Sequence, residues 1–159
     1  MSLQISTKGR YALRSMLDIA RQSVNGTVKI KEIAERQNIS VKYLEQIVSE
    51  LSRAGLLNSK RGPNGGYSLT RPPEDYTVNS ILNVTEGNLS IVQCVSDKEY
   101  ACERYDGCAT VKLWSKINDT IAEVTDSITL ADLLEWDREG GGISNPPQEN
   151  EELLRNTKE

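Results

Sequence analysis

The stretch from residue 31 to residue 53 constrains the fold most, because it reads as two short helices joined by a tight turn. The second helix is predicted from Val41 to about Arg53. Its apolar residues recur at the spacing of one helix face, and they are Leu44, Ile47, Val48 and Leu51. The same spacing on the opposite face holds four polar residues, which are Lys42, Glu45, Gln46 and Ser49. We therefore predict a helix with a buried inner face and a polar outer face that can hydrogen-bond to DNA.

A hairpin is predicted directly after this helix. Two short strands, at 56–60 and 67–70, flank the Gly-rich segment Arg61-Gly-Pro-Asn-Gly-Gly-Tyr67. Glycine tolerates the positive φ angles that a tight reversal needs. Two helices at turn spacing followed by a hairpin are typical of the winged helix-turn-helix. The expected fold is mainly α, with a small β-wing.

Hydroxyl residues mark the expected helix starts, because Ser and Thr side chains accept hydrogen bonds from the free amides of the first turn. The first helix is expected to begin at Ser6 or Thr7, and Ser40 is expected to cap the outer-faced helix. Thr77 precedes a short helix that ends at Gly87, and Thr129 precedes a final turn through Leu134. Residues 88–108 are polar and without period, which predicts a loop.

A long helix is predicted from residue 109, with an apolar seam at Val111, Trp114, Ile117, Ile121, Val124 and Ile128. This spacing resembles that of a coiled coil, so we expect a dimerisation helix. The alternative is a helix that packs on its own winged domain. The apolar content of 37% with no Phe is modest for a large core, and this favours an interface with a second subunit.

The expected organisation has three parts. Residues 1–77 form the winged helix-turn-helix domain, residues 78–134 hold the linker helix, cysteine loop and dimerisation helix, and residues 135–159 form a disordered acidic tail. Lys and Arg exceed Asp and Glu by 12 to 7 in the first part, whereas they number 4 against 9 in the second. A basic part joined to an acidic one is the distribution expected of a DNA-binding head on an acidic body.

The predicted DNA-binding residues follow from these elements. On the outer face Gln46 suits adenine, Glu45 accepts from cytosine, and Lys42 reaches guanine or phosphate. Arg61 at the wing suits a narrow minor groove, or is a solvated turn residue. Ser40, Tyr43 and Lys8 complete the set, with Tyr43 packing near a phosphate and Lys8 holding the DNA backbone.

Three cysteines, Cys94-x7-Cys102-x5-Cys108, form the candidate metal site. Thiolates suit iron–sulfur clusters or zinc, but the two close pairs of a structural zinc site do not occur. The spacing fits a 2Fe-2S cluster that takes one further ligand, such as a carboxylate from Asp97, Glu99, Glu103 or Asp106, another oxygen donor or an external thiol. The alternative is a cluster-free, redox-active site that forms a Cys102–Cys108 disulfide or a sulfenate.

Four motifs of the chain belong together: Ile5-Ser-Thr-Lys-Gly-Arg-Tyr-Ala-Leu13, Tyr43-Leu-Glu-Gln46, the Gly-rich hairpin and the cysteine run. Through them, roughly residues 4–134 resemble the IscR/CymR-type family of winged-helix transcriptional regulators. It implies a homodimer that crosses through the long helix and binds a palindromic operator, with Lys42, Glu45, Gln46 and Arg61 in base-contacting positions. The cysteine run resembles the iron–sulfur IscR-like branch, whose members have a histidine three residues after the last cysteine. Val111 stands there, and the chain contains no histidine.

The leading hypothesis is a homodimeric transcriptional regulator, expected to be a repressor, that senses iron–sulfur or redox status. The alternative is a cluster-free regulator controlled by thiol oxidation or by a protein partner of cysteine metabolism. A carrier protein whose winged helix binds protein is a third hypothesis, which the basic first part disfavours.

No motif for a catalytic nucleophile is present, so an enzyme is not expected. No stretch reaches 18 apolar residues and no signal peptide is visible, so we expect a cytoplasmic protein with no membrane contact.

Overall fold

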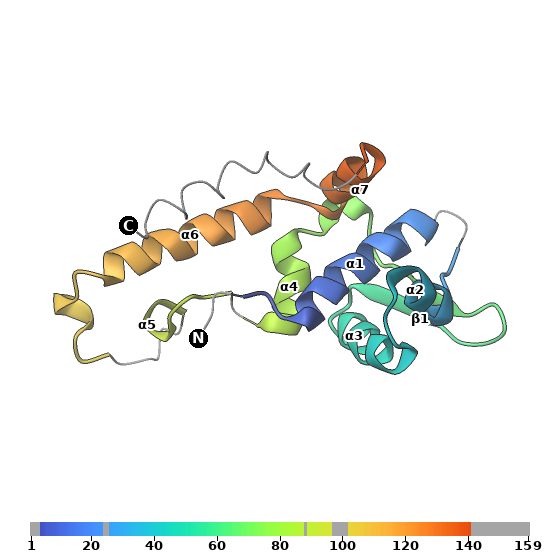
Figure 1. Ribbon diagram of the computed structural model, residues 1–159, viewed down its shortest axis with the longest axis horizontal. Coiled ribbons are helices and arrows are strands. Elements are labelled where there is room, and N and C mark those ends of the chain that lie inside the picture. The colour runs from blue at the N-terminus through green and yellow to red at the C-terminus, as the bar shows by residue number, and fades with distance from the viewer. Residues whose placement is uncertain (1–3, 24–25, 88, 97–101, 141–159) are drawn as a thin grey trace, which may run out of the picture.

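The computed structural model describes residues 4–23, 26–87, 89–96 and 102–140. Its elements follow in the order α1 (Thr7–Gln22), α2 (Ile30–Gln37), α3 (Val41–Arg53), β1 (Leu57–Lys60), β2 (Gly66–Leu69), η2 (Pro73–Asp75), α4 (Val78–Glu86), α5 (Gln93–Ser96), η3 (Tyr105–Gly107), α6 (Val111–Ser127) and α7 (Leu130–Arg138). Figure 1 shows α1 to α4, the two strands and α7 gathered at one end of the molecule, which we call the head. Helix α6 extends away from the head toward the segment that holds α5. The predicted fold class, mainly α with a two-stranded wing, is confirmed.

Hydroxyl side chains cap four of the helices at the predicted positions. Ser6, Ser40 and Thr77 each accept a hydrogen bond from a backbone N–H in the first turn of α1, α3 and α4. Thr129 does so for α7, where Asp132 bonds back to the Thr129 N–H and completes a capping box. Each cap satisfies an amide that the helix itself leaves free, so these starts follow from local sequence.

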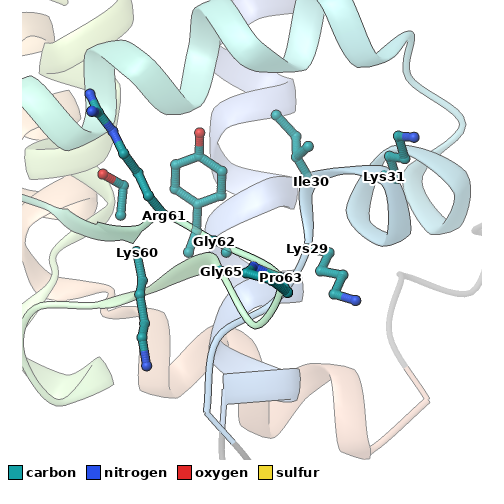
Figure 2. Close-up of a pocket in the computed structure, with 11 residues that line it drawn as sticks. Lys29, Ile30, Lys31, Lys60, Arg61, Gly62, Pro63 and Gly65 are labelled. Atoms are coloured by element: carbon teal, nitrogen blue, oxygen red, sulfur yellow. The ribbon is translucent and has the colours of Figure 1, made fainter.

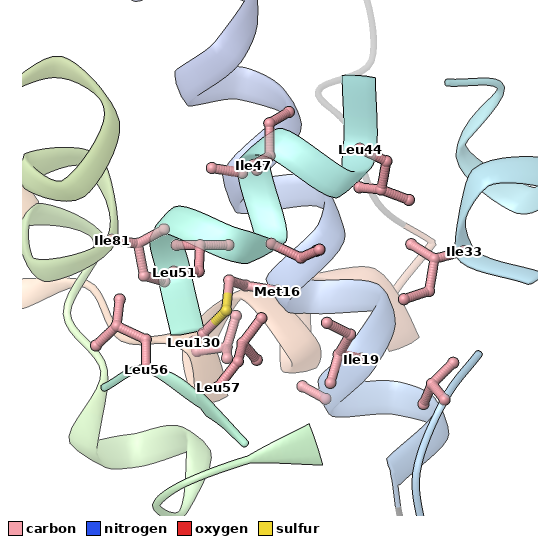
Figure 3. Packing of buried hydrophobic residues seen from close by; sticks show 14 of the residues in the cluster. Met16, Ile19, Ile33, Leu44, Ile47, Leu51, Leu56, Leu57, Ile81 and Leu130 are labelled. Carbon is pink, nitrogen blue, oxygen red and sulfur yellow. The ribbon is translucent and has the colours of Figure 1, made fainter. Parts of the chain in front are cut away.

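The core of the head forms where α1 and α3 pack together, and α2, α4, α7 and the strands cover the remaining sides (Figure 3). All four inner-face residues of α3 have zero exposure, as the sequence predicts. Ile81 of α4 and Leu130 of α7 are also fully buried in this core. The core therefore draws on residues on both sides of position 77, and the division at that position remains a prediction.

Asp18 joins α1 to α2 from inside the head. Its carboxylate is only 4% exposed and pairs with the Arg36 guanidinium at 2.6 Å. Gln37 also donates to this carboxylate at 2.8 Å. The hydrogen bond to Asp18 is the main cause of a raised Arg36 pKa. A buried carboxylate is costly unless paired, so Asp18 holds α2 at a fixed place against α1.

Tyr76 ties the base of the wing together. Its side chain is fully buried, and its hydroxyl donates to the Leu56 carbonyl at 3.0 Å. The same oxygen accepts from the backbone N–H groups of Thr70 at 2.8 Å and Arg71 at 2.9 Å. One phenol therefore hydrogen-bonds to backbone groups just before β1 and just after β2.

The wing is an antiparallel hairpin in which Leu57 pairs with Leu69 and Lys60 with Gly66. Val28, just before α2, adds an isolated bridge to Tyr67 through two hydrogen bonds of 2.8 Å. Gly66 has φ +154°, and a Cβ there would lie 2.5 Å from the Val28 carbonyl oxygen. The close approach of the Val28 segment to the wing thus requires glycine at this position.

Helix α6 has no buried residue, although it carries the predicted apolar seam. It packs on α4 and α5, and this leaves Val124 of the seam and Leu113 beside the seam each 50% exposed. Packing within the chain therefore covers the seam only in part, and dimerisation through α6 remains a prediction. Across the described ranges, no helix combines the length and apolar character needed to span a membrane.

Two expectations about the chain after α4 were wrong. The polar segment 88–108 is not only loop, because it contains the single helical turn α5 and the 3-10 turn η3; elements this short have too few positions for a period. Helix α7 continues to Arg138 instead of ending at Leu134, and Asp137 in its last turn pairs with Arg21 of α1 at 3.2 Å. The predicted tail from residue 135 therefore begins as helix, and residues 141–159 lie outside the described residues.

Replacing Tyr76 by Phe should lower the free energy of unfolding by about 2 kcal/mol, because two amides lose their acceptor and the Leu56 carbonyl loses the nearer of its two hydroxyl donors. Urea denaturation measures this as a lower midpoint at an unchanged slope. Tyr105, which is 45% exposed, provides the matched control, since Tyr105→Phe should leave the midpoint where it is. Equal midpoints for the two variants would contradict the role assigned to the Tyr76 hydroxyl.

Candidate nucleic-acid interface and cysteine segment

The turn between α2 and α3 decides where the outer face of α3 begins. Asn38 ends α2 in the left-handed conformation, with φ 53°, and Ile39 is buried beneath the turn. Ser40 then accepts the Tyr43 N–H at 3.3 Å. Ser40 therefore caps α3 and is also exposed to solvent. Its contact with DNA remains a prediction.

The outer face of α3 is open to solvent. Lys42, Glu45 and Gln46 are all exposed, as predicted. Together with Ser49, Glu50 and Arg53 they line a shallow hollow along the helix. The hollow thus presents donors and acceptors in one row, which is what reading base edges in a major groove requires.

Tyr43 lies at the edge of this face and is half-buried. Its ring packs edge-on against Tyr11 of α1, with 6.0 Å between centroids and 72° between planes. The guanidinium of Arg14 lies over the Tyr11 ring, 5.5 Å from its centroid. This agrees with the expectation that Tyr43 mainly packs, while its proximity to a phosphate remains a prediction.

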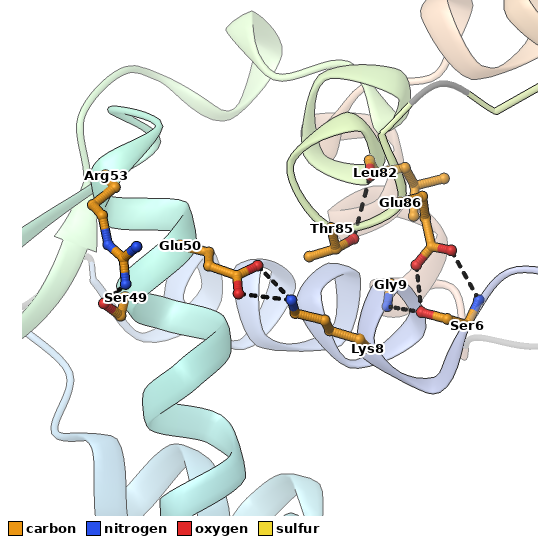
Figure 4. A network of polar contacts seen from close by, with 9 residues as sticks. All are labelled: Ser6, Lys8, Gly9, Ser49, Glu50, Arg53, Leu82, Thr85 and Glu86. Carbon is orange, nitrogen blue, oxygen red and sulfur yellow. Dashed lines mark hydrogen bonds and ion pairs between the residues drawn. The ribbon is translucent and has the colours of Figure 1, made fainter.

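Lys8, predicted to hold the DNA backbone, has a partner within the chain (Figure 4). Its ammonium pairs with the Glu50 carboxylate of α3 at 2.6 and 2.7 Å. Two residues earlier, the Ser6 N–H and hydroxyl both donate to Glu86, the last residue of α4. The carboxylate of Glu50 therefore offsets the charge of Lys8. The contact observed for Lys8 joins α1 to α3.

Arg61 is exposed immediately after β1, where the wing turns. It lines a hollow of about 700 Å³ between the wing and the start of α2, together with Lys29, Lys31 and Lys60 (Figure 2). Sequence reasoning found Arg61 but missed these three lysines. Lys60 could have been found because it is next to Arg61 in the chain. Lys29 could not, because tertiary contacts of the preceding residues, Thr27 and Val28, bring it to the wing.

The three cysteines lie on the segment between α4 and α6. Cys94 is in α5, Cys102 precedes η3, and Cys108 follows η3 just before α6. All three are free thiols of intermediate exposure. Within the described ranges, no group of three or more Cys, His, Asp or Glu is gathered so that it could hold a metal ion.

The donor set nevertheless fits an iron–sulfur cluster in its chemistry. Three soft thiols on one segment supply the ligand type that such clusters take. Of the suggested oxygen donors, Glu103 and Asp106 are exposed on the same segment, and Asp97 and Glu99 lie outside the described residues. The chain thus provides three suitable ligands on one segment, without a closed site in the part that is described.

Cys108 is the cysteine with a distinct electrostatic setting. The Thr110 hydroxyl lies 3.1 Å from its sulfur, and this contact is the main cause of a lowered Cys108 pKa. The backbone amides of Thr110 and Val111, at the start of α6, add to the effect. Donors directed at the sulfur stabilise the thiolate, which is both the nucleophile and the metal-binding form.

A helix-turn-helix whose second helix shows a bare polar face, followed by a wing, defines a winged-helix DNA-binding regulator. Residues 5–136 match the model of the Rrf2 family, described as an iron-dependent transcriptional regulator, and the chain belongs to this family. The chain is therefore a transcriptional regulator of the IscR/CymR type, in agreement with the resemblance seen in the sequence. Its relatives are regulators and not enzymes.

Both branches of this type are represented among the relatives. The structure of CymR, described as the global cysteine regulator of Bacillus subtilis, matches with TM-score 0.70 and 42% identity over 85% of this chain and 98% of that chain. The structure of T. potens IscR matches with TM-score 0.69 and 40% identity over 89% and 93%. IscR of Serratia proteamaculans is 38% identical over 83% of this chain and 79% of that protein.

In cluster-free protein, Cys108 should be alkylated by iodoacetamide at a lower pH than an ordinary thiol of pKa about 8.5, because its lowered pKa leaves more thiolate below that pH. Peptide mass mapping of samples quenched along a pH series measures the midpoint for each cysteine. Thr110→Val keeps the side-chain shape but removes the hydroxyl, so the Cys108 midpoint should rise. A midpoint that does not respond to this substitution would contradict the assigned cause.

Proposed function

We propose that this chain is a homodimeric, cytoplasmic transcriptional repressor that binds a palindromic duplex-DNA operator and senses iron–sulfur or redox status at its cysteines. The observation that carries the DNA-binding part is the bare polar face of α3 beside a wing bearing Arg61. Membership of a family of transcriptional regulators supports the same conclusion. The finer roles below are parts of this proposal.

On the DNA, α3 enters the major groove and the wing reaches the adjacent minor groove. Gln46 pairs with adenine, Glu45 accepts from cytosine N4, and Lys42 binds guanine or phosphate. Arg61 enters a narrow, A·T-rich minor groove, where the negative potential is strongest. Three residues around this surface contact the DNA backbone: Ser40, Tyr43 and Lys8. Lys8 does so after it exchanges the Glu50 carboxylate for a DNA phosphate.

Dimerisation is assigned to α6. Its seam is only partly covered by its own chain: Val124 is 50% exposed, the other seam residues are half-buried, and Leu113 beside the seam is also 50% exposed. Pairing two copies along this helix removes apolar surface from water at roughly 25 cal/mol per Å². Two heads related by a twofold axis bind two half-sites in opposite directions, so the operator is palindromic.

The sensing role is assigned to Cys94, Cys102 and Cys108 as three ligands of a 2Fe-2S cluster. A carboxylate such as Glu103 or Asp106, or an external thiol, supplies the fourth ligand in this chain without histidine. When bound, the cluster supplies a redox-active, exchangeable group. Identity to the IscR and CymR relatives is similar, so the cysteines themselves are what favours the iron–sulfur branch.

A second candidate keeps the DNA binding and replaces the cluster by thiol oxidation or by a protein partner of cysteine metabolism. The lowered pKa of Cys108 favours it, because thiolate character increases reactivity toward oxidants. Similarity to the cysteine regulator CymR points the same way. In this candidate Cys102 and Cys108 lose two electrons and two protons to an oxidant such as peroxide and form a disulfide.

Gln46→Ala and Arg61→Ala should each weaken binding to a duplex selected from a random-sequence pool by roughly 5- to 150-fold, since a good base contact contributes about 1–3 kcal/mol. Fluorescence anisotropy measures the affinity, and analytical ultracentrifugation checks that the dimer persists. Lys116→Ala, on the exposed surface of α6, is the control that should leave the affinity unchanged. Unchanged affinity in both test variants would overturn the proposed reading surface.

Cys102→Ser should abolish cluster binding, because a hydroxyl is a poor substitute for a soft thiolate ligand. Anaerobically purified wild-type protein should show visible charge-transfer absorption and iron and sulfide near two per subunit, and the variant should show neither. A fully loaded variant would refute the ligand assignment. A colourless wild-type protein that also resists reconstitution would favour thiol or partner sensing and leave the DNA-reading surface in place.

A further inference from the structure

Two hollows flank the wing, and Lys29, Lys60 and Gly65 line both of them. The first hollow also contains Lys31 and Arg61. Neither hollow is lined by Asp or Glu, although the whole chain has 23 acidic residues against 19 basic ones. A cationic surface without a carboxylate is therefore concentrated around the wing.

The cations that line these hollows form no ion pair within the described ranges of the chain. The ion pairs found there use Lys8, Arg21 and Arg36, and none uses a cation of the two hollows. Lys29, Lys60 and Arg61 are all exposed. Unpaired cations that line the same hollow repel one another, and a bound anion relieves that repulsion.

Backbone contacts hold Lys29 beside the wing. Val28, the preceding residue, exchanges two 2.8 Å hydrogen bonds with Tyr67 and is 3% exposed. Thr27 donates its hydroxyl to the Asn64 carbonyl at 3.1 Å. The backbone at Lys29 is thus held beside the hairpin that carries Lys60, even though the two residues are far apart in sequence.

Figure 2 shows that Lys60 and Arg61 point to opposite sides of the wing. A minor groove is about 6 Å wide and is bounded by a phosphate backbone on each side. A wing placed in such a groove has one backbone on either flank. Arg61 serves one flank, so the other requires a separate source of positive charge.

We propose that Lys29 and Lys60 form a second phosphate-binding site, which holds the DNA backbone on the side of the wing opposite to Arg61. This rests on the proposed function, in which α3 and the wing bind duplex DNA. The ligand chemistry is a phosphate group, and its source is the phosphodiester backbone. The contact carries no base information, so it strengthens binding to every sequence alike.

The test compares wild type, a Lys29→Gln/Lys60→Gln double variant and the control Lys112→Gln/Lys116→Gln, which removes the same charge from the exposed surface of α6. Anisotropy titrations over a series of KCl concentrations use the selected duplex and a shuffled duplex. The slope of log affinity against log salt should become shallower by about 0.9 for each phosphate that the double variant no longer binds, counted over both heads. Affinity for the two duplexes should fall by the same factor, with the slope of the control unchanged.

A double variant with the same slope as its control would overturn the site and leave the proposed function intact. Wild-type protein without salt-dependent duplex binding would overturn the proposed function itself. Calorimetric titration with inorganic phosphate distinguishes a site for free phosphate from a site for the DNA backbone. Saturable phosphate binding that the double variant loses, with an unaltered DNA slope, would identify a free-anion site and overturn the backbone assignment.

Discussion

The packing of α3 on α1 is the interaction on which the rest of the head depends. Leu44, Ile47, Val48 and Leu51 are all removed from water, and each contributes roughly 1.5–3 kcal/mol by burial. Once these side chains face α1, the opposite face of α3 must point outward. The direction of Lys42, Glu45 and Gln46 is therefore a consequence of hydrophobic burial, and the polar residues do not have to secure it themselves.

The same head is joined to α6 through a short backbone connection. The Val78 N–H donates to the Ile128 carbonyl, and the Leu130 N–H donates to the Tyr76 carbonyl, each at 2.8 Å. The Tyr76 hydroxyl in turn bonds at the base of the wing. Helix α6 also packs on α4, so these two bonds are one of its links to the head. The buried side chain of Tyr76 thereby links the end of α6 to the base of the wing.

Electrostatics distinguishes the two surfaces of the head that are proposed to face DNA. Beside α3, Glu50 offsets Lys8, and Glu45 adds a further carboxylate, so this surface suits selective hydrogen bonding. Around the wing, Lys29, Lys60 and Arg61 have no carboxylate beside them. Phosphate contacts supply affinity and base contacts supply discrimination. The cations around the wing suit phosphate contacts, and the mixed charges beside α3 suit base contacts, although the chain as a whole carries a net charge of −4.

The sequence by itself determined the features that depend on near neighbours: the caps at Ser6 and Ser40, the inner face of α3 and the hairpin. A cap and a helical period each involve residues within a few positions of one another, so their pattern is visible in one dimension. Only the tertiary structure decided that Lys8 meets Glu50 and that Lys29 lies beside the wing. The partners Lys8 and Glu50 are 42 positions apart. No local pattern encodes such a pair, because its separation in space is set by how helices pack around a common core.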